Sequence, residues 1–123
     1  MNLNFLIWLN EGISIIDQFA LSKGVEVDIY LSNSGEIHLS RIFVPKENRR
    51  QGSGSDVMQF IIDYADRENR IITLSPSVDF GATSVNRLKN FYKQFGFVEN
   101  KGRNKNYKYS ATMLRYPINF KRI

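Results

Sequence analysis

A glycine-rich, cationic turn, Arg-Arg-Gln-Gly-Ser-Gly at residues 49–54, is the feature that most constrains the fold of this chain. It lies between a strand-like run, Ile37 to Val44, and a helix-like run, Asp56 to Asp66. The first N–H groups of a helix have no intrahelical partners, the macrodipole adds positive potential there, and glycine lets backbone amides approach a ligand. The turn therefore predicts an anion site, with phosphate as the expected ligand. A polar loop before an ordinary helix cap is the alternative that this motif alone leaves open.

The length and composition indicate one soluble domain without a metal cofactor. With 123 residues the chain is long enough to form a core, and we expect a single domain over residues 1–123. It has no Cys and one His, which excludes a thiol nucleophile and disfavours a metal cluster. The apolar run at residues 5–9 is too short to span a bilayer, and no leader-like cleavage site follows it. We therefore expect a cytoplasmic protein, in keeping with the lack of Cys, and no membrane partner.

The net charge of +5 is unevenly distributed along the chain. Residues 1–40 carry one Lys against five acidic residues, whereas residues 99–123 carry seven basic residues against one acid. The basic end suggests an anionic partner such as nucleic acid or an acidic protein surface. Solvated faces that keep the domain soluble are the alternative. The cations considered for nucleic acid, which are interleaved with Tyr107 and Tyr109, are Lys101, Arg103, Lys105 and Lys108.

Hydrophobic spacing predicts the element order α-α-β-β-α-β-α-β-β. Gly12 should separate the first two helices, and Gly96 should end the last helix in a left-handed conformation. An Asn-Ser-Gly turn should join the first two strands as a hairpin. In chain order the expected elements lie near residues 5–9, 13–20, 25–31, 37–44, 56–66, 71–74, 85–95, 97–99 and 111–116.

This order, the glycine turn and a second motif resemble the GNAT family of acyl-CoA-dependent N-acetyltransferases. The second motif comprises Phe91, Tyr92, Gly96 and Phe97, and the turn fits the family form Q/R-x-x-G-x-G/A. The resemblance covers about residues 25–117, and the later part looks most like the short stand-alone members of bacteriophages and mobile elements. It implies an α/β (α+β) GNAT-like fold, with a mixed, mostly antiparallel sheet flanked by helices. The family's usual strand before the first helix is missing here.

The resemblance implies that acetyl-CoA is the co-substrate. Its pyrophosphate would bind the amides of the turn, and its pantetheine and thioester would lie along the strand before it. The family's usual Asn in the second motif aligns with Val85, so Asn86 or Ser84 is expected to replace it. The implied cofactor contacts are Ile42, Val44, Arg49, Arg50, Gln51, Gly52, Ser53, Gly54, Ser55 and Asn86.

The resemblance also implies an acid, and the residues suggest a base. Tyr92 matches the family's proton donor, and a phenol with an ordinary pKa of about 10 stays protonated at neutral pH. A tyrosine that only packs in the core is the alternative for this position. His38 is the candidate base because histidine titrates near neutrality, with Glu36 or an ordered water as alternatives. Strict alternation would place both on the strand face that also carries Ile42.

These features together predict transfer of acetyl from acetyl-CoA to a primary amine, by direct attack in a ternary complex. The amine would belong to a small molecule or a protein lysine. Glu11 and Asp17, expected to lie across from the basic loop, would suit a cationic acceptor. The alternative is a catalytically inactive GNAT-fold module that binds nucleic acid or an acidic protein through its basic C-terminal region. Either a monomer or a homodimer fits the sequence.

Overall fold

The computed structural model describes residues 3–49, 51–76 and 84–118, with residues 3–11 described by their backbone alone. Within these residues no helix has the length and apolarity needed to cross a membrane. The elements in chain order are α1 Leu3–Ser22, β1 Glu26–Leu31, β2 Ile37–Phe43, the 3-10 turn η1 Lys46–Asn48, α2 Ser53–Arg67, β3 Ile72–Leu74, α3 Val85–Lys93, β4 Val98–Glu99, the 3-10 turn η2 Gly102–Asn104 and β5 Met113–Arg115.

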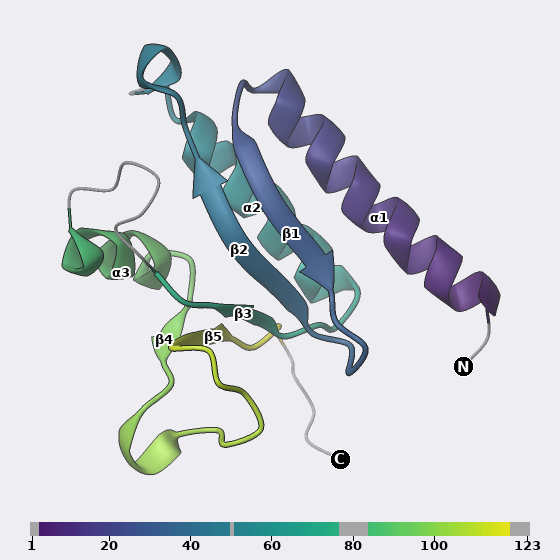
Figure 1. Ribbon diagram of the computed structural model, residues 1–123, viewed down its shortest axis with the longest axis vertical. Coiled ribbons are helices and arrows are strands. Elements are labelled where there is room, and N and C mark those ends of the chain that lie inside the picture. The colour runs from purple at the N-terminus through teal and green to yellow at the C-terminus, as the bar shows by residue number, and fades with distance from the viewer. Residues whose placement is uncertain (1–2, 50, 77–83, 119–123) are drawn as a thin grey trace.

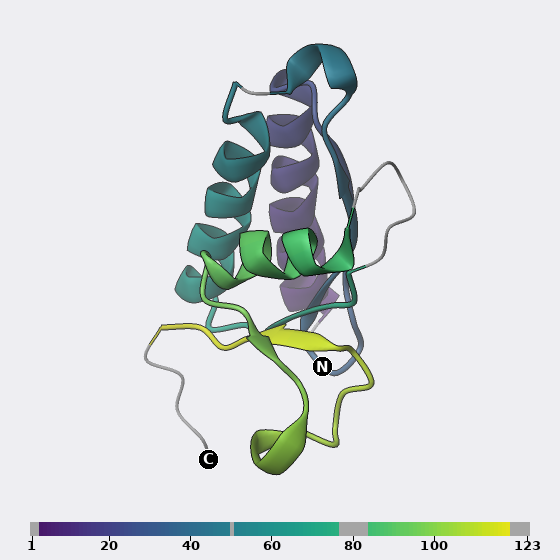
Figure 2. The ribbon, with the colours of Figure 1, turned by 90° about the vertical axis from the view of Figure 1, so that its left-hand side faces the viewer.

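The strands form one mixed sheet in the order β1-β2-β3-β5-β4. β2 and β3 are parallel, and the other neighbouring pairs are antiparallel. α1 packs on β1 and α2, and α2 packs on β2. Figures 1 and 2 show α1 and α2 on the same side of the β1–β2 hairpin. The mixed, mostly antiparallel sheet flanked by helices is confirmed.

The prediction of two helices before the first strand is wrong, because α1 continues through Gly12. A Cβ atom at Gly12 would collide with the ring of Tyr64 on α2. The glycine therefore lets two helices approach closely, and it does not end the first one. An interior glycine costs a helix about 1 kcal/mol relative to alanine, and the packing of α1 on α2 offsets this cost.

The core lies between the hairpin and the helices. Helical spacing places Ile13, Ile16 and Ala20 of α1 on this side, while Ile37 and Leu39 alternate into it from β2. The residues predicted to form the buried face of α2 are buried, namely Val57, Met58, Ile61, Ile62 and Ala65. Leu88 and Phe91 of α3, and Phe95 just after it, pack against the same cluster, which also contains Tyr92.

The end of α3 is fixed by two interactions. Gly96 has a φ of +91°, and the N–H groups of Gly96 and Phe97 donate to the carbonyls of Lys93 and Tyr92 at 3.1 and 3.4 Å. This is a Schellman motif, so the expected left-handed helix end is confirmed. Arg115 of β5 then donates to the carbonyl of Phe95 at 2.7 Å. Arg115 also forms a two-pronged ion pair with Asp66 at the end of α2, at 2.8 and 3.1 Å.

Candidate active site

The glycine turn opens directly onto α2. Gly52 is the N-cap, and no side chain caps the helix there. The first helical hydrogen bond runs from the N–H of Asp56 to the carbonyl of Gly52, at 2.9 Å. The N–H groups of Ser53, Gly54 and Ser55 therefore have no intrahelical acceptor. Three amides and the positive end of the helix dipole meet at this turn, as an anion site requires.

The two glycines of the turn are needed for different reasons. Gly52 has a φ of +73°, a left-handed conformation that residues with a side chain rarely adopt. No described atom lies within 4 Å of the position of its missing Cβ, so the space beside the amides is open. A Cβ at Gly54 would instead lie 3.2 Å from Cγ2 of Val44. Gly54 therefore lets the start of α2 pack against the end of β2.

A cationic rim borders this turn. Nε of Arg49 donates to the carbonyl of Val44 at 2.9 Å, and its guanidinium lies 5.8 Å from the centre of the Phe43 ring. Arg50 lies outside the described residues, Gln51 and Ser55 are exposed, and Ser53 is buried. The carboxylate of Asp56, in the first turn of α2, pairs with Lys23 at 3.5 Å, so part of its charge is compensated by α1.

The sheet opens beside this turn. β3 pairs with β2 only from Ile37 to Leu39, whereas β2 continues to Phe43. Over Ser40 to Phe43, β2 has no paired strand on the β3 side among the described residues. Among the described residues, the backbone of this part of β2 is therefore left without a strand partner on that side. Ile42 and Val44 are partly buried against the core, so only their backbones are placed to contact a ligand in the gap.

A β-bulge at Ser40 changes which residues share a face of β2. Asp28 pairs with Arg41 and Ile29 pairs with Leu39, so Ser40 is the extra residue. Ile42 pairs with Val27 and lies on the same face as Leu39. The expectation that His38 shares a face with Ile42 is wrong, because the bulge shifts the alternation by one residue. His38 shares its face with Arg41 instead.

His38 is held in place from both neighbouring strands. Its Nδ1 lies 2.8 Å from Oγ1 of Thr73, the residue paired with it on β3. Its ring centre lies 5.1 Å from that of Tyr30, the residue paired with it on β1. Thr73 is buried and His38 is half-buried. With Nδ1 in this hydrogen bond, Nε2 is the nitrogen left to exchange a proton.

Tyr92 lies in the core at the end of α3. It is only 6% exposed, and its ring makes edge contacts with Phe91 and Phe97 at 5.4 and 5.7 Å between centres. Burial raises the pKa of Tyr92 from 10.0 to about 12, so the phenol is protonated throughout the neutral range. No described residue makes a hydrogen bond with its hydroxyl. Within the described part of the chain, no acceptor therefore engages this donor.

The start of α3 supplies the remaining residues expected at the site. Oγ of Ser84 accepts a hydrogen bond from the N–H of Arg87 at 3.3 Å, as an N-cap does. This hydroxyl is therefore engaged, whereas Asn86 is exposed on the first turn. Between these two alternatives, the structure leaves Asn86 better placed to meet a ligand.

The acidic residues are distributed differently from the expectation. Burial and the nearby carboxylate of Asp28 raise the pKa of Asp17, so these two acids lie near each other at the β1 edge. The acids that face the basic loop are Glu36 and Glu99. Partial burial opposes ionisation of Glu36, but hydrogen bonds from Ser32 and Ser34 and the charge of Lys108 lower its pKa. The side chain of Glu11 lies outside the described residues.

Sequence reasoning missed Thr73, Ser40 and Asn100. Thr73 could have been noticed as the polar residue within an otherwise apolar buried strand, Ile71 to Leu74. Ser40 carries no local signal, since a bulge depends on the register between two strands. Asn100 is buried and organises the basic loop, and its only sequence signal is its place at the end of a strand.

Comparisons with known proteins agree with this geometry. A family model described as "Acetyltransferase (GNAT) domain" matches residues 7–99. Among solved structures, the chain is similar to Ard1 from Thermoplasma volcanium, with 23% identity and a TM-score of 0.53 over 74% of this chain and 61% of that chain. It is also similar to Arabidopsis thaliana Naa50 in complex with a bisubstrate analogue, with 19% identity and a TM-score of 0.48 over 74% of this chain and 62% of that chain.

The chain spans less than two thirds of the length of either of these structures. A search of curated proteins found no match. The family model covers well over half of the chain, and the fold of Ard1 agrees with the mixed sheet described above. This chain therefore belongs to the GNAT acetyltransferase domain family.

Proposed function

We propose that this chain transfers the acetyl group of acetyl-CoA to a primary amine in a ternary complex. The observation that carries the proposal is the uncapped glycine turn at the end of a splayed strand. The turn offers amides to a pyrophosphate, and the gap between β2 and β3 offers backbone to the rest of the cofactor. Membership of an acetyltransferase domain family supports the same activity.

The proposed cofactor contacts run along β2 into α2. The amides of Ser53, Gly54 and Ser55 would bind the pyrophosphate, with Arg49 adding positive charge at the rim. The backbone of Ile42 and Val44 would meet the pantetheine and the thioester carbonyl. The other proposed contacts are Arg50, Gln51, Gly52 and Asn86.

The reaction needs few groups beyond these contacts. The amine nitrogen attacks the thioester carbonyl carbon, so a C–N bond forms and the C–S bond breaks. The nitrogen loses a proton to a base, and the departing thiolate takes one from an acid. Backbone N–H groups in the gap would stabilise the oxyanion that develops on the carbonyl oxygen.

The positions of His38 and Tyr92 suit these two proton transfers. Ile37 and Leu39 point into the core that contains Tyr92, so His38, between them on β2, points to the opposite face. We assign His38 as the base on the side from which the amine arrives. Tyr92 would act as the acid on the core side. Nδ1–H of His38 would donate to Thr73 and leave the Nε2 lone pair for the amine.

The face that carries His38 favours a cationic acceptor. Asp28 is exposed on that face opposite Arg41, whose guanidinium pairs with Glu26 at 3.4 Å, and Asp17 of α1 lies near Asp28. These carboxylates would attract an alkylammonium group such as that of a protein lysine or a small polyamine.

We place the chain with the short stand-alone members of the family, as in phages and mobile elements, and in the cytoplasm.

Thermal unfolding with acetyl-CoA tests this proposal. At a hundredfold excess over its Kd, a ligand of the native state adds about 2.7 kcal/mol, which corresponds to several degrees of Tm for a domain of this size. Gly52→Ala should remove most of that shift, since the new Cβ enters the open space beside the amides. No shift of the unmodified protein at millimolar acetyl-CoA would refute the proposal.

Gly102→Ala is the matched control for Gly52→Ala. Both glycines have a φ of +73°, and neither has a described atom within 4 Å of its missing Cβ. Each alanine therefore pays the same backbone strain, about 1 kcal/mol. Only the variant in the turn should lose the acetyl-CoA shift. An equal loss in both variants would show that strain alone accounts for it.

A further inference from the structure

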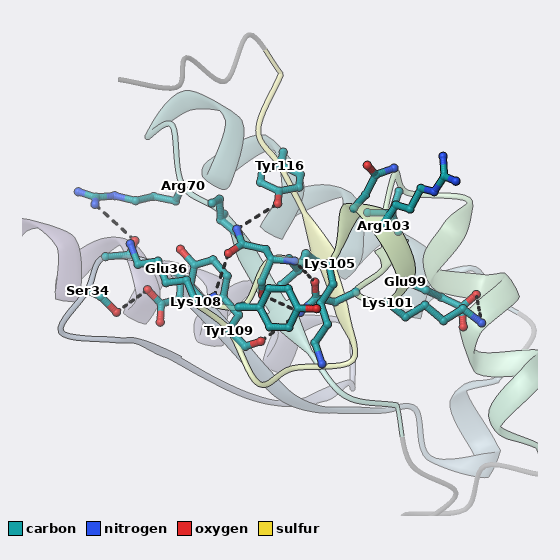
Figure 3. A pocket seen from close by; sticks show the side chains of 18 of the residues that line it. Ser34, Glu36, Arg70, Glu99, Lys101, Arg103, Lys105, Lys108, Tyr109 and Tyr116 are labelled. Atoms are coloured by element: carbon teal, nitrogen blue, oxygen red, sulfur yellow. Dashed lines mark hydrogen bonds and ion pairs between the residues drawn. The ribbon is translucent and has the colours of Figure 1, made fainter.

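A hollow lies at the opposite end of β2 from the glycine turn. It has a volume of about 1020 Å³ and is lined by residues in or beside β4 and β5 and by three connections between elements. These are the β1–β2 turn at residues 34–36, the α2–β3 connection at 69–71, and the long β4–β5 connection. Figure 3 shows side chains of the connection, including Lys108 and Tyr109, beside Ser34 and Glu36.

Cations outnumber acids around this hollow. The lining acids are Glu36 and Glu99, and the lining cations are Arg70, Lys101, Arg103, Lys105 and Lys108. Lys89 and Lys93 of α3 pair with Glu99 at 3.0 and 3.4 Å, and Lys101 of the lining pairs with it at 3.6 Å, so three cations share the charge of this one acid. The hollow therefore presents an excess of positive charge.

Two tyrosines stand among these cations. Tyr107 is 84% exposed, and Nζ of Lys105 lies 5.2 Å from the centre of its ring. Nζ of Lys108 lies 5.6 Å from the ring of Tyr109. An exposed ring buries no apolar surface in this chain, so Tyr107 does not stabilise the core. The ring face turned away from Lys105 is open to a stacking partner.

The loop that carries these groups is built around a buried amide. Nδ2 of Asn100 donates to the carbonyls of Asn106, Tyr109 and Ala111 at 3.1 to 3.2 Å, and its Oδ1 accepts from the N–H of Asn106 at 2.7 Å. The Asn106 side chain continues this network. It accepts from the N–H of Lys108 at 3.0 Å and donates to the hydroxyl of Tyr116 at 3.2 Å. The loop is therefore ordered before any partner arrives, which lowers the entropic cost of binding.

We propose that this basic loop surface, defined as Lys101, Arg103, Lys105, Tyr107, Lys108 and Tyr109, binds single-stranded nucleic acid. Cations that follow a groove bind phosphates, and aromatic faces stack on unpaired bases. An acidic peptide would use the cations but would leave the exposed ring without a partner. Because the surface lies at the other end of β2 from the glycine turn, this binding does not depend on acetyl-CoA.

Fluorescence anisotropy of labelled 12-nucleotide oligo(U) and oligo(dT), without acetyl-CoA, tests the inference. We expect binding at low salt that weakens with a log–log slope of about −0.7 for each phosphate neutralised, hence about −3 for four cations. Lys105→Glu should weaken binding and flatten this slope. Lys46→Glu is the matched control, since it reverses the same charge on an exposed lysine outside the hollow.

The tyrosine is tested by a second pair of variants. Tyr107→Ala should weaken binding by about 5- to 150-fold, because base stacking on an aromatic ring is worth about 1–3 kcal/mol. Tyr107→Phe keeps the ring and should bind like the unmodified protein. The exposure of Tyr107 means that neither change should lower the melting temperature.

Three results would overturn the inference. One is no binding of either oligonucleotide at low salt. Another is an equal loss in Lys46→Glu and Lys105→Glu, which would indicate only net charge. The third is competition by poly-glutamate as effective as that of unlabelled oligonucleotide, which would favour an acidic protein partner. Since Lys105→Glu should leave the acetyl-CoA thermal shift intact, failure here is distinguishable from failure of the proposed function.

Discussion

Tyr92→Phe should leave stability near neutral pH almost unchanged and lower activity, and this combination separates a functional tyrosine from a structural one. The ring of Tyr92 keeps its edge contacts with Phe91 and Phe97 when only the hydroxyl is deleted. That hydroxyl forms no hydrogen bond with a described residue, and it is not a buried polar atom without a partner, so its deletion breaks no described hydrogen bond and relieves little desolvation cost. We therefore expect the free energy of unfolding at pH 8 to change by less than about 0.5 kcal/mol, or roughly 2 °C in Tm.

The raised pKa of Tyr92 makes the effect of Tyr92→Phe on stability depend on pH. The pKa of Tyr92 is about 12 in the folded protein and 10.0 in the unfolded chain, so below pH 10 its ionisation does not lower the free energy of unfolding. As the pH rises from 10 towards 12, the free energy of unfolding falls, because the unfolded chain releases the phenolic proton first. From pH 8 to pH 10.5, the free energy of unfolding of the unmodified protein should therefore fall by about 0.8 kcal/mol relative to that of the Phe variant. Urea unfolding of both proteins at pH 8 and 10.5 measures this difference.

Activity is the second measurement. Single-turnover acetyl transfer to polylysine should fall by about 10²- to 10⁴-fold in Tyr92→Phe, while the acetyl-CoA thermal shift stays the same. Tyr116→Phe provides a contrast in stability, since it deletes a hydroxyl that accepts a hydrogen bond from Asn106 at 3.2 Å and should be destabilising. If Tyr92→Phe transfers acetyl at the original rate, or loses stability as Tyr116→Phe does, the reasoning fails.

Two further predictions follow from single contacts. Gly12→Ala should lower the free energy of unfolding by about 1–3 kcal/mol despite the better helix propensity of alanine, because the new Cβ collides with Tyr64. Urea unfolding measures this change, and a stabilised variant would contradict the packing of α1 on α2. Thr73→Val should lower kcat about 2- to 12-fold, because it removes the hydrogen bond that orients His38. Thr73→Ser keeps a hydroxyl and should restore kcat. An unchanged kcat in the Val variant, or a Ser variant as slow as the Val variant, would contradict this role of Thr73.

Local patterns in the sequence were sufficient to predict the features that depend on residues close together in the chain. The left-handed end of α3 needs a glycine, so Gly96 identified it. The apolar spacing of α2 identified its buried face, because that helix packs on one side only. Gly12 failed as a local signal, since its neighbour Tyr64 is fifty-two positions away in the chain and decides its role.

The parts of the site that could not be predicted depend on pairs of distant residues. The hydrogen bond between His38 and Thr73 joins residues 35 positions apart, through a parallel pairing that no local pattern specifies. The loop network of Asn100 depends on three carbonyls brought together by a closed turn. The uncapped geometry of the glycine turn could be predicted because its free amides belong to consecutive residues.

The bulge at Ser40 connects the packing of the core with the opening of the site. On a strictly alternating strand, Arg41 would follow Leu39 into the core and Ile42 would face outward. The extra residue reverses this, so Ile42 packs inward with Val27 and Arg41 joins His38 on the outer face. A bulge also bends its strand, and β2 loses its pairing with β3 at this same residue. One inserted residue thus keeps the core apolar, brings Arg41 onto the face of the candidate base, and coincides with the end of the β2–β3 pairing beside the glycine turn.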